Sequence, residues 1–431
     1  MSRGTTTGAE PPMLARALIT LGAPLVVWLV RHAPLDSLEA HGTATVGDLT
    51  VGLAPVATGF LLVEVFAALL PSARALRSSG PDGRARLTRW AMVASAGALA
   101  FQLLGVALFW NRLGELTLGS ALALVAINVP FTLGLAWLAR VVSRQGLANG
   151  YAVLFAAHAL PVELVLDHPY GRLAGLGVCV GSMAVVAATL RSPKATQRRG
   201  ELVLRAPLCG LLPITLTGGL LLLPYSLGSS LEQLLPLDAL EHFLPGRPQH
   251  VLVLAVSVVL LSVACSWAFH RPDTVAPLFP GMDAFTVREA VREALPYTVM
   301  ALSALTVGAT LVERSMGAPL LGYLPGLAYL TALLLDVRDE RLARERLGRL
   351  VPVWDEHRAY ALGPLQKALE DAQIPVHARA AYYRPLVQLA GPLVPLTLMV
   401  PPAHATAALE VLTARNAAFQ EQLAGHAPST F

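Results

Sequence analysis

Long apolar runs decide what this chain can fold into. Each is long enough, or nearly so, to cross the roughly 30 Å of hydrocarbon in a bilayer as a helix. A backbone in hydrocarbon must satisfy its own hydrogen bonds, and these runs are too long and too rich in Leu and Ala for barrel strands. We therefore expect ten transmembrane helices. The runs cover residues 14–32, 51–70, 90–110, 118–139, 151–166, 173–190, 207–224, 250–269, 296–312 and 319–336.

Composition agrees with a membrane protein that crosses the bilayer many times. Of 431 residues, 55% are hydrophobic and only 14% are charged, which leaves too little polar surface for a soluble globule of this size. The net charge of +4 would favour nucleic acid in a soluble protein, but loops that face anionic lipid explain it here. We therefore expect the lipid bilayer as a partner, and we expect no nucleic acid to bind.

Arginine content alternates between the loops. Loops 72–89, 140–150, 191–205 and 270–295 are rich in Arg and Lys, whereas the loops between them carry about one basic residue each. Basic residues near helix ends are retained on the cytoplasmic side. This pattern predicts a multi-pass protein of the inner (plasma) membrane with both termini in the cytoplasm.

The chain becomes polar after its last apolar run. Residues 338–351 are rich in Arg and Glu and predict a charged juxtamembrane helix. Residues 352–415 read as a small cytoplasmic α+β domain, followed by a tail over 416–431. Its expected elements are strands over 351–357, 374–378 and 393–401 and helices over 359–372 and 404–415.

Nothing in the sequence favours an enzyme. It has no Walker A loop, no G-x-S-x-G and no H-E-x-x-H motif. Cys179, Cys209 and Cys265 lie in apolar runs without C-x-x-C spacing, so we interpret them as small packing residues. No catalytic residue, metal or cofactor is expected.

A turn between two apolar runs carries a family resemblance. Gln145-Gly-Leu-Ala-Asn-Gly150 resembles the R-G-I-G-N-G turn of the SecY protein-conducting channels, with Gly146, Asn149 and Gly150 kept. Other blocks resemble the family in the same order, over residues 52–64, 80–87, 204–213 and 271–276. The resemblance covers about residues 14–336.

The resemblance implies two inverted five-helix halves around a central pore. These would be residues 1–170 and 171–337, with a plug over about 34–50 on the outer side. A narrow apolar ring would seal the pore against ions, and a lateral gate between the second and seventh spans would release hydrophobic segments into lipid.

Residue by residue, the resemblance assigns the pore ring to Leu53, Ala57, Phe155 and Thr215. The family's ring is mostly isoleucine, so Ala57 and Thr215 would weaken the seal unless bulky neighbours or the plug fill the gap.

At the lateral gate, Glu64 stands in place of the family's glutamine and Pro207 in place of an asparagine. A carboxyl group at bilayer depth is costly and usually faces a partner or water. Glu64 reads equally well as a gate residue and as a glutamate without a role.

The cytoplasmic loops depart further from the family. The resemblance makes Arg84, Arg86, Arg205 and Asp283 candidates for docking a cytosolic motor or ribosome. Asp283 stands where the family has an arginine. The family connects its sixth and seventh spans by a long basic hairpin, whereas here only about 16 residues, 191–206, connect them. An acidic replacement inverts the local charge, so docking of the usual kind is not expected.

Residues 352–415 resemble a second family, a small ferredoxin-like signal-transducing domain of prokaryotes with a G-I-P-like turn, here Gln373-Ile-Pro375. The expected partners are polypeptide clients, small membrane subunits of the SecE and SecG type, and a cytosolic partner bound through this domain.

Three function classes remain open. The first is a SecY-like translocation channel or insertase, a divergent paralogue with dedicated clients. The second is a non-conducting SecY-like scaffold or regulatory platform. The third is a solute transporter, although Glu64 alone is a poor substitute for the cluster of buried polar residues that such a protein shows at mid-span.

Overall fold

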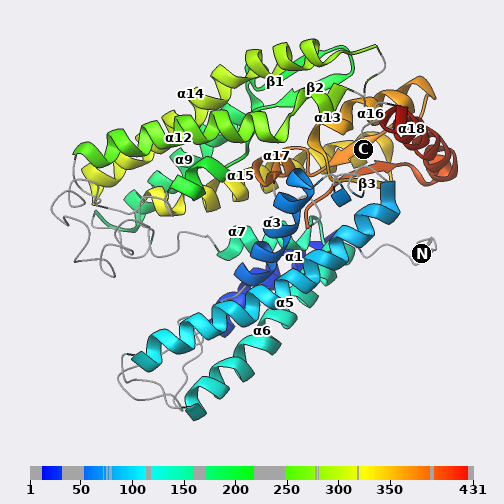
Figure 1. Ribbon diagram of the computed structural model, residues 1–431. Coiled ribbons are helices and arrows are strands. Elements are labelled where there is room, and N and C mark those ends of the chain that lie inside the picture. The colour runs from blue at the N-terminus through cyan, green and yellow to red at the C-terminus, as the bar shows by residue number, and fades with distance from the viewer. Residues whose placement is uncertain are drawn as a thin grey trace. The chain divides into compact units, whose positions relative to one another are not determined.

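Helices dominate the computed structural model of the chain, which is drawn in Figure 1. The structure describes residues 12–31, 53–70, 72–73, 76, 80–112, 118–158, 165, 170–217, 248–276, 279, 281–317, 320–388 and 393–425. The expected plug, residues 34–50, and Glu163 near the end of the fifth expected span lie outside these ranges.

Six helices in the described part of the chain are long and apolar enough to cross a membrane. They overlap six of the expected spans, 90–110, 118–139, 173–190, 250–269, 296–312 and 319–336, and confirm that these runs are helical. The six are α5 (Gly80–Arg112), α6 (Leu118–Gln145), α9 (Arg172–Arg191), α12 (Pro248–Phe269), α14 (Ala284–Met316) and α15 (Leu320–Leu347).

The other four expected spans are shorter or only partly described. Helices α1 (Met13–Arg31) and α3 (Ala54–Leu69) contain the shorter apolar stretches Met13–Leu29 and Pro55–Ala67. Helix α7 (Gly150–His158) begins the expected fifth span, and residues 212–217 are helical in the seventh. The total of ten spans stays a prediction.

By contact density the chain divides into two units. The first contains Met1–Ala67 and Ala85–His158, and the second contains Ala68–Arg84 and Ala159–Phe431. The division passes through α5, whose first residues belong to the second unit.

In the first unit, small residues let helices pack backbone to backbone. A Cβ atom on Gly59 of α3 would lie 2.3 Å from the backbone nitrogen of Ser95 in α5. The Ser95 hydroxyl donates to the carbonyl of Ala91 in its own helix at 2.7 Å and reaches that of Val56 in α3 at 3.3 Å. Close approach through glycine and serine is the usual way in which membrane helices associate, because lipid gives apolar side chains little reason to do so.

The second unit combines four long helices with a small mixed region. Helix α14 packs against α12 and α15, and α15 packs against α9. Asp283 caps the start of α14 by accepting a hydrogen bond from the Thr286 N–H at 2.8 Å, and Gly317 ends the helix at a left-handed φ of 66°.

The mixed region contains the expected α+β elements. Strands β3, β5 and β4 form one antiparallel sheet in that order. The strand expected over 374–378 is the short β4, and the last helix continues to Gly425, through residues that we assigned to the tail. The elements are β3 (Val351–Glu356), η4 (Ala359–Ala361), α16 (Leu362–Asp371), β4 (His377–Arg379), α17 (Tyr383–Leu386), β5 (Leu396–Val400), η6 (Pro402–His404) and α18 (Ala405–Gly425).

A hairpin that the sequence analysis did not predict connects α9 to the seventh expected span. After η2 (Pro193–Ala195), strands β1 (Thr196–Arg199) and β2 (Leu202–Arg205) pair antiparallel around Gly200, whose φ is 59°. Leu202 and Leu204 point inward from β2 and are fully buried.

One hydrophobic core joins this hairpin to the α+β region. It includes Leu202 and Leu204 of the hairpin, Val287 and Val291 of α14, and Trp354 of β3, and it extends to buried leucines of α16, β5 and α18. Residue 363 is a glycine because α16 touches the hairpin turn: a Cβ there would lie 2.3 Å from the Glu201 carbonyl oxygen. The α+β region therefore packs directly on two loops: the one before the seventh expected span and the one after the eighth.

Candidate functional site

The turn at residues 145–150, which carries the family resemblance, is a tight connection between α6 and α7. The Asn149 carboxamide oxygen caps α7 by accepting hydrogen bonds from the N–H groups of Tyr151 and Ala152, at 3.0 and 3.2 Å. A Cβ on Gly150 would lie 1.9 Å from the Ala139 carbonyl oxygen, and one on Gly146 would lie 2.6 Å from that of Val142. The pattern thus needs glycine at both positions and a capping side chain between them.

Helix α1 is tied to this turn by polar side chains. Arg16 is only 7% exposed, and its guanidinium donates to the Gly146 carbonyl oxygen at 3.2 and 3.0 Å. The Thr20 hydroxyl oxygen accepts from the Leu147 N–H at 2.8 Å. The sequence analysis missed Arg16, although a charge within an apolar run is a usual sign of a structural or functional contact.

The ring candidates are divided between the two units. In the first unit, Leu53 and Ala57 lie at the start of α3, where the Ala57 N–H donates to the Leu53 carbonyl at 3.0 Å, and Phe155 lies on α7, half-buried. Thr215 belongs to the second unit and is exposed. A ring made from these four residues stays a prediction.

The gate candidates are divided in the same way. Glu64 is 2% exposed on α3 in the first unit, and Pro207 is buried at the start of the seventh expected span in the second. Their role at a gate stays a prediction.

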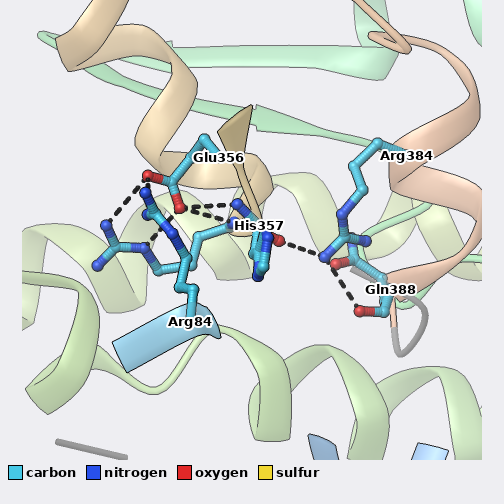
Figure 2. Close-up of polar contacts among 6 residues, drawn as sticks. Arg84, Glu356, His357, Arg384 and Gln388 are labelled. Atoms are coloured by element: carbon cyan, nitrogen blue, oxygen red, sulfur yellow. Dashed lines mark hydrogen bonds and ion pairs between the residues drawn. The ribbon is translucent and has the colours of Figure 1, made fainter. Parts of the chain in front are cut away.

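Arg84 lies in a buried charge cluster, which Figure 2 shows. Its guanidinium donates to Glu356 Oε2 at 3.0 Å and lies 5.3 Å above the Trp354 ring. Arg358 holds the same carboxylate, with its Nε 3.0 Å from Glu356 Oε1 and one Nη 3.3 Å from Oε2. The backbone N–H groups of His357 and Arg358 also donate to Oε1. The side chains of Arg84, Glu356 and Arg358 are at most 5% exposed.

The cluster keeps Glu356 ionised. Burial alone would raise the pKa of this carboxyl group, but the nearby charges of Arg358 and Arg84 outweigh burial and hold the pKa well below its ordinary value of 4.5. Burial in turn works against the charge of Arg358, and Glu356 raises the pKa of that guanidinium. Each charge is therefore stable in the interior only because the others are present.

The remaining docking candidates differ in exposure. Arg86 is exposed on α5. Arg205 is half-buried: it donates to the Ala381 carbonyl at 2.9 Å, and its guanidinium lies 5.2 Å from the Tyr382 ring centre. Asp283 is the α14 cap described above, and its hydrogen bond to Thr286 lowers the pKa of its carboxyl group. Arg84 and Arg205 thus have partners within the chain, and docking through these four residues stays a prediction.

Three buried carboxylates were not among the predicted site residues: Glu356, which accepts from Arg84, Glu340, which accepts from Arg379, and Asp336, which accepts from the backbone N–H groups of Tyr382 and Tyr383. Each of Glu356, Asp336 and Glu340 has a partner at least 39 positions away, which no local spacing in the sequence marks. Asp336 lies at the end of an apolar run, and a charge in such a place usually marks a structural or functional contact, as at Arg16. Among the described residues no group of three His, Cys, Asp or Glu side chains is arranged to hold a metal ion.

Comparison with known sequences gives distant relatives of one kind, and no protein-family model matches the chain. It is 24% identical over 269 residues to the protein translocase subunit SecY of Synechococcus elongatus, across 54% of this chain and 60% of that protein. The SecY subunit of Pseudomonas aeruginosa is 20% identical over 269 residues, across 54% and 61%. That of Synechocystis is 23% identical over 227 residues, across 45% and 51%. The chain thus matches about three fifths of the length of the first of these relatives.

Solved structures share the fold. One, described as the structure of a protein conducting channel, has a TM-score of 0.51 at 14% identity and matches 78% of this chain and 94% of that one. Another, which concerns the plug domain that stabilises the closed state of the SecY translocation channel, has a TM-score of 0.50 with the same identity and coverage. In sequence and in fold, this chain is distantly similar to the SecY proteins.

Proposed function

We propose that this chain is a SecY-like channel that moves polypeptides across the inner membrane or inserts them into it. The observation that carries the proposal is the fold shared with a protein-conducting channel over most of both chains. Six long apolar helices and the glycine-dependent turn at 146–150 support it. In this proposal the halves are residues 1–170 and 171–337, and both termini face the cytoplasm.

The channel would act as a paralogue with its own clients. Asp283 caps a helix where the family pattern has an arginine, and Arg84 and Arg205 have partners inside the chain. A surface changed in this way favours a different cytosolic partner, recognised by residues 352–415. Small membrane subunits of the SecE and SecG type would complete the assembly.

Photocrosslinking in cells tests conduction. A photoreactive residue at Thr215 or Leu53 should form adducts with nascent or secreted polypeptides, because both positions belong to the proposed ring. Leu173 on α9 is the matched control: it is 86% exposed on a long apolar helix, so a probe there should form adducts with lipid instead. If neither ring position gives polypeptide adducts while the protein is assembled in the membrane, the chain does not conduct.

The second candidate is a non-conducting scaffold with the same fold. The observation that favours it is the packing of the α+β region on the loop before the seventh expected span and on the loop after the eighth. Such a scaffold would give no polypeptide adducts at Thr215 or Leu53, and it would still bind a cytosolic partner.

A further inference from the structure

Residues Arg379–Gln388 link the α+β region to two other parts of the second unit. We call them the clamp. They run from the end of β4 through α17, and they contact α15 on one side and residues 205–211, at the start of the seventh expected span, on the other.

The clamp is fastened to α15 by carboxylates. Glu340 accepts two hydrogen bonds from the Arg379 guanidinium, at 2.6 and 2.7 Å. One turn earlier, the two oxygens of Asp336 accept from the N–H groups of Tyr382 and Tyr383, both at 2.9 Å. Asp336 and Glu340 are 6% and 4% exposed, so water competes little for these bonds.

The clamp is rigid because Arg384 ties its backbone together. This arginine is 1% exposed, and its guanidinium donates to the carbonyls of Val387 and Gln388, at 2.9 and 3.2 Å, and to that of His357 beyond the clamp. Figure 2 shows Arg384 between His357 and Gln388. The clamp is thereby coupled to the strand that carries Glu356.

The other side of the clamp holds residues 205–211. The Arg205 guanidinium binds the Ala381 carbonyl and covers the Tyr382 ring. The Leu211 N–H donates to the Leu386 carbonyl at 3.0 Å. At Gly210, with a φ of 64°, a Cβ would lie 2.4 Å from that same carbonyl oxygen, so the two backbones are in direct contact.

We propose that the clamp is a built-in lock on the start of the seventh span. The clamp lies between α15 and residues 205–211 and is hydrogen-bonded to both, so this segment cannot shift relative to α15 unless the clamp shifts or its bonds break. Whatever lifts the α+β region therefore releases this segment, and whatever stabilises that region holds it. This movement of the chain does not depend on whether polypeptides pass through it.

Cys209 is a natural reporter for this movement, because it lies within the locked segment and is 0% exposed. In the full-length protein with Cys179→Ala and Cys265→Ala, N-ethylmaleimide should label Cys209 slowly. The double variant Asp336→Ala/Arg379→Ala removes the fastening to α15 and should raise the labelling rate at least about tenfold, which corresponds to about 1.4 kcal/mol. The control Arg341→Ala removes an exposed ion pair of the same helix, with Glu345, and should leave the rate unchanged.

Tyr382→Ala is a milder second variant, in case the double variant does not assemble. It deletes the ring under Arg205 and keeps the backbone contacts of the clamp, so a smaller rise in labelling is expected. Trypsin cleavage after Arg358, which is 4% exposed in the folded α+β region, reports separately whether that region has lifted. Labelling of Cys209 at the parental rate in an assembled variant whose α+β region has lifted would overturn the proposal.

Discussion

Arg84 and Arg86 lie two residues apart on α5 and have opposite surroundings. Arg84 is 4% exposed and paired with Glu356, whereas Arg86 is exposed. Removing one member of a buried ionic group leaves charge that neither water nor a partner compensates, at a cost of about 3–5 kcal/mol when no partner remains. Because Arg358 still contacts Glu356, we expect Arg84→Ala to cost about 2 kcal/mol, close to the value of a hydrogen bond to a charged group.

Arg86→Ala is the matched control and should change stability by less than about 0.5 kcal/mol. The measurement is the thermal unfolding midpoint of the protein in detergent, together with the resistance of the buried Arg358 to trypsin. Equal unfolding midpoints for Arg84→Ala and Arg86→Ala would contradict the prediction that the buried cluster stabilises the fold.

Glu356 also predicts how stability depends on pH. Its pKa is lower in the folded protein than the ordinary 4.5, so the folded state binds this proton less readily than the unfolded state does. The resulting stabilisation is complete above about pH 4.5 and is lost as the pH falls toward the lower folded-state pKa. We therefore expect the α+β region to become trypsin-sensitive as the pH is lowered below about 4.5.

Protein exposed to each pH and returned to neutral buffer only for a brief trypsin pulse would report this loss. The variant Glu345→Gln, which changes an exposed carboxyl group of α15, should keep the parental acid profile, and Glu356→Gln should lose most of its protection already at neutral pH. Protection that persists unchanged in Glu356→Gln would exclude Glu356 as the source of the acid sensitivity.

Gln373 occupies a backbone position that favours glycine. It follows α16 with a φ of 56°, its N–H donates to the Glu370 carbonyl at 2.9 Å, and the Ile374 N–H donates to the Leu369 carbonyl at 2.8 Å. These two bonds are a Schellman ending, whose left-handed residue is usually glycine. We expect Gln373→Gly to raise the stability by up to about 1 kcal/mol, by relieving the strain of a side chain in the left-handed region. Thermal unfolding tests this, and a lowered midpoint would mean that the side chain contributes more than the strain costs.

Among the elements, the turn from α6 to α7 gives the sharpest prediction. Gly150→Ala would bring a Cβ within 1.9 Å of the Ala139 carbonyl oxygen, and a backbone atom cannot move aside as a flexible side chain can. We expect a loss of about 1–3 kcal/mol, as for other overpacked sites, or failure to assemble. Gly134→Ala, on α6 with nothing within 4 Å of the added atom, should cost nothing. The yield of folded protein from membranes and its unfolding midpoint distinguish the two, and similar values for both variants would rule out the close contact.

Elements were predictable where the bilayer leaves a single choice. The apolar runs over 173–190 and 250–269 had to be helices because strands without partners cannot exist in hydrocarbon, and both are helices. The hairpin at 196–205 was missed because its strands depend on distant partners: Leu202 and Leu204 are buried in a core that they share with residues as far away as Trp354 and Leu365. The ionic cluster was missed for the same reason, since Arg84 and Glu356 are 272 positions apart. A ring formed by Leu53 and Thr215 depends on how two units meet, which no spacing in the sequence encodes.

At the scale of the whole molecule, contacts within the second unit constrain which loops share a side of the membrane. Arg84 of loop 72–89 pairs with Glu356. Leu202 and Leu204 of loop 191–205 and Val275 and Val287 of loop 270–295 belong to the same core as Trp354. Three loops rich in arginine therefore lie on the same side as the α+β region. The alternation of arginines in the sequence also predicts that these loops lie on one side of the membrane. That prediction uses charge alone and no contact in the structure.

Reporter fusions test on which side of the membrane the arginine-rich loops and the α+β region lie. Since arginine-rich loops are retained in the cytoplasm, green fluorescent protein fused after Phe431 should fluoresce, and alkaline phosphatase fused there should be inactive. Alkaline phosphatase fused within residues 113–117, between α5 and α6, should be active, because that loop lies one span away from the arginine-rich side. Replacing Arg86 and Arg89 with Ala in the fusions removes basic charge and leaves the buried Arg84 in place. This change should weaken the preference for the cytoplasmic orientation without reversing it, because two further basic loops are bound to the same core. An active phosphatase after Phe431 in the parental protein would place the arginines outside and overturn both the orientation and the cytosolic role proposed for residues 352–415.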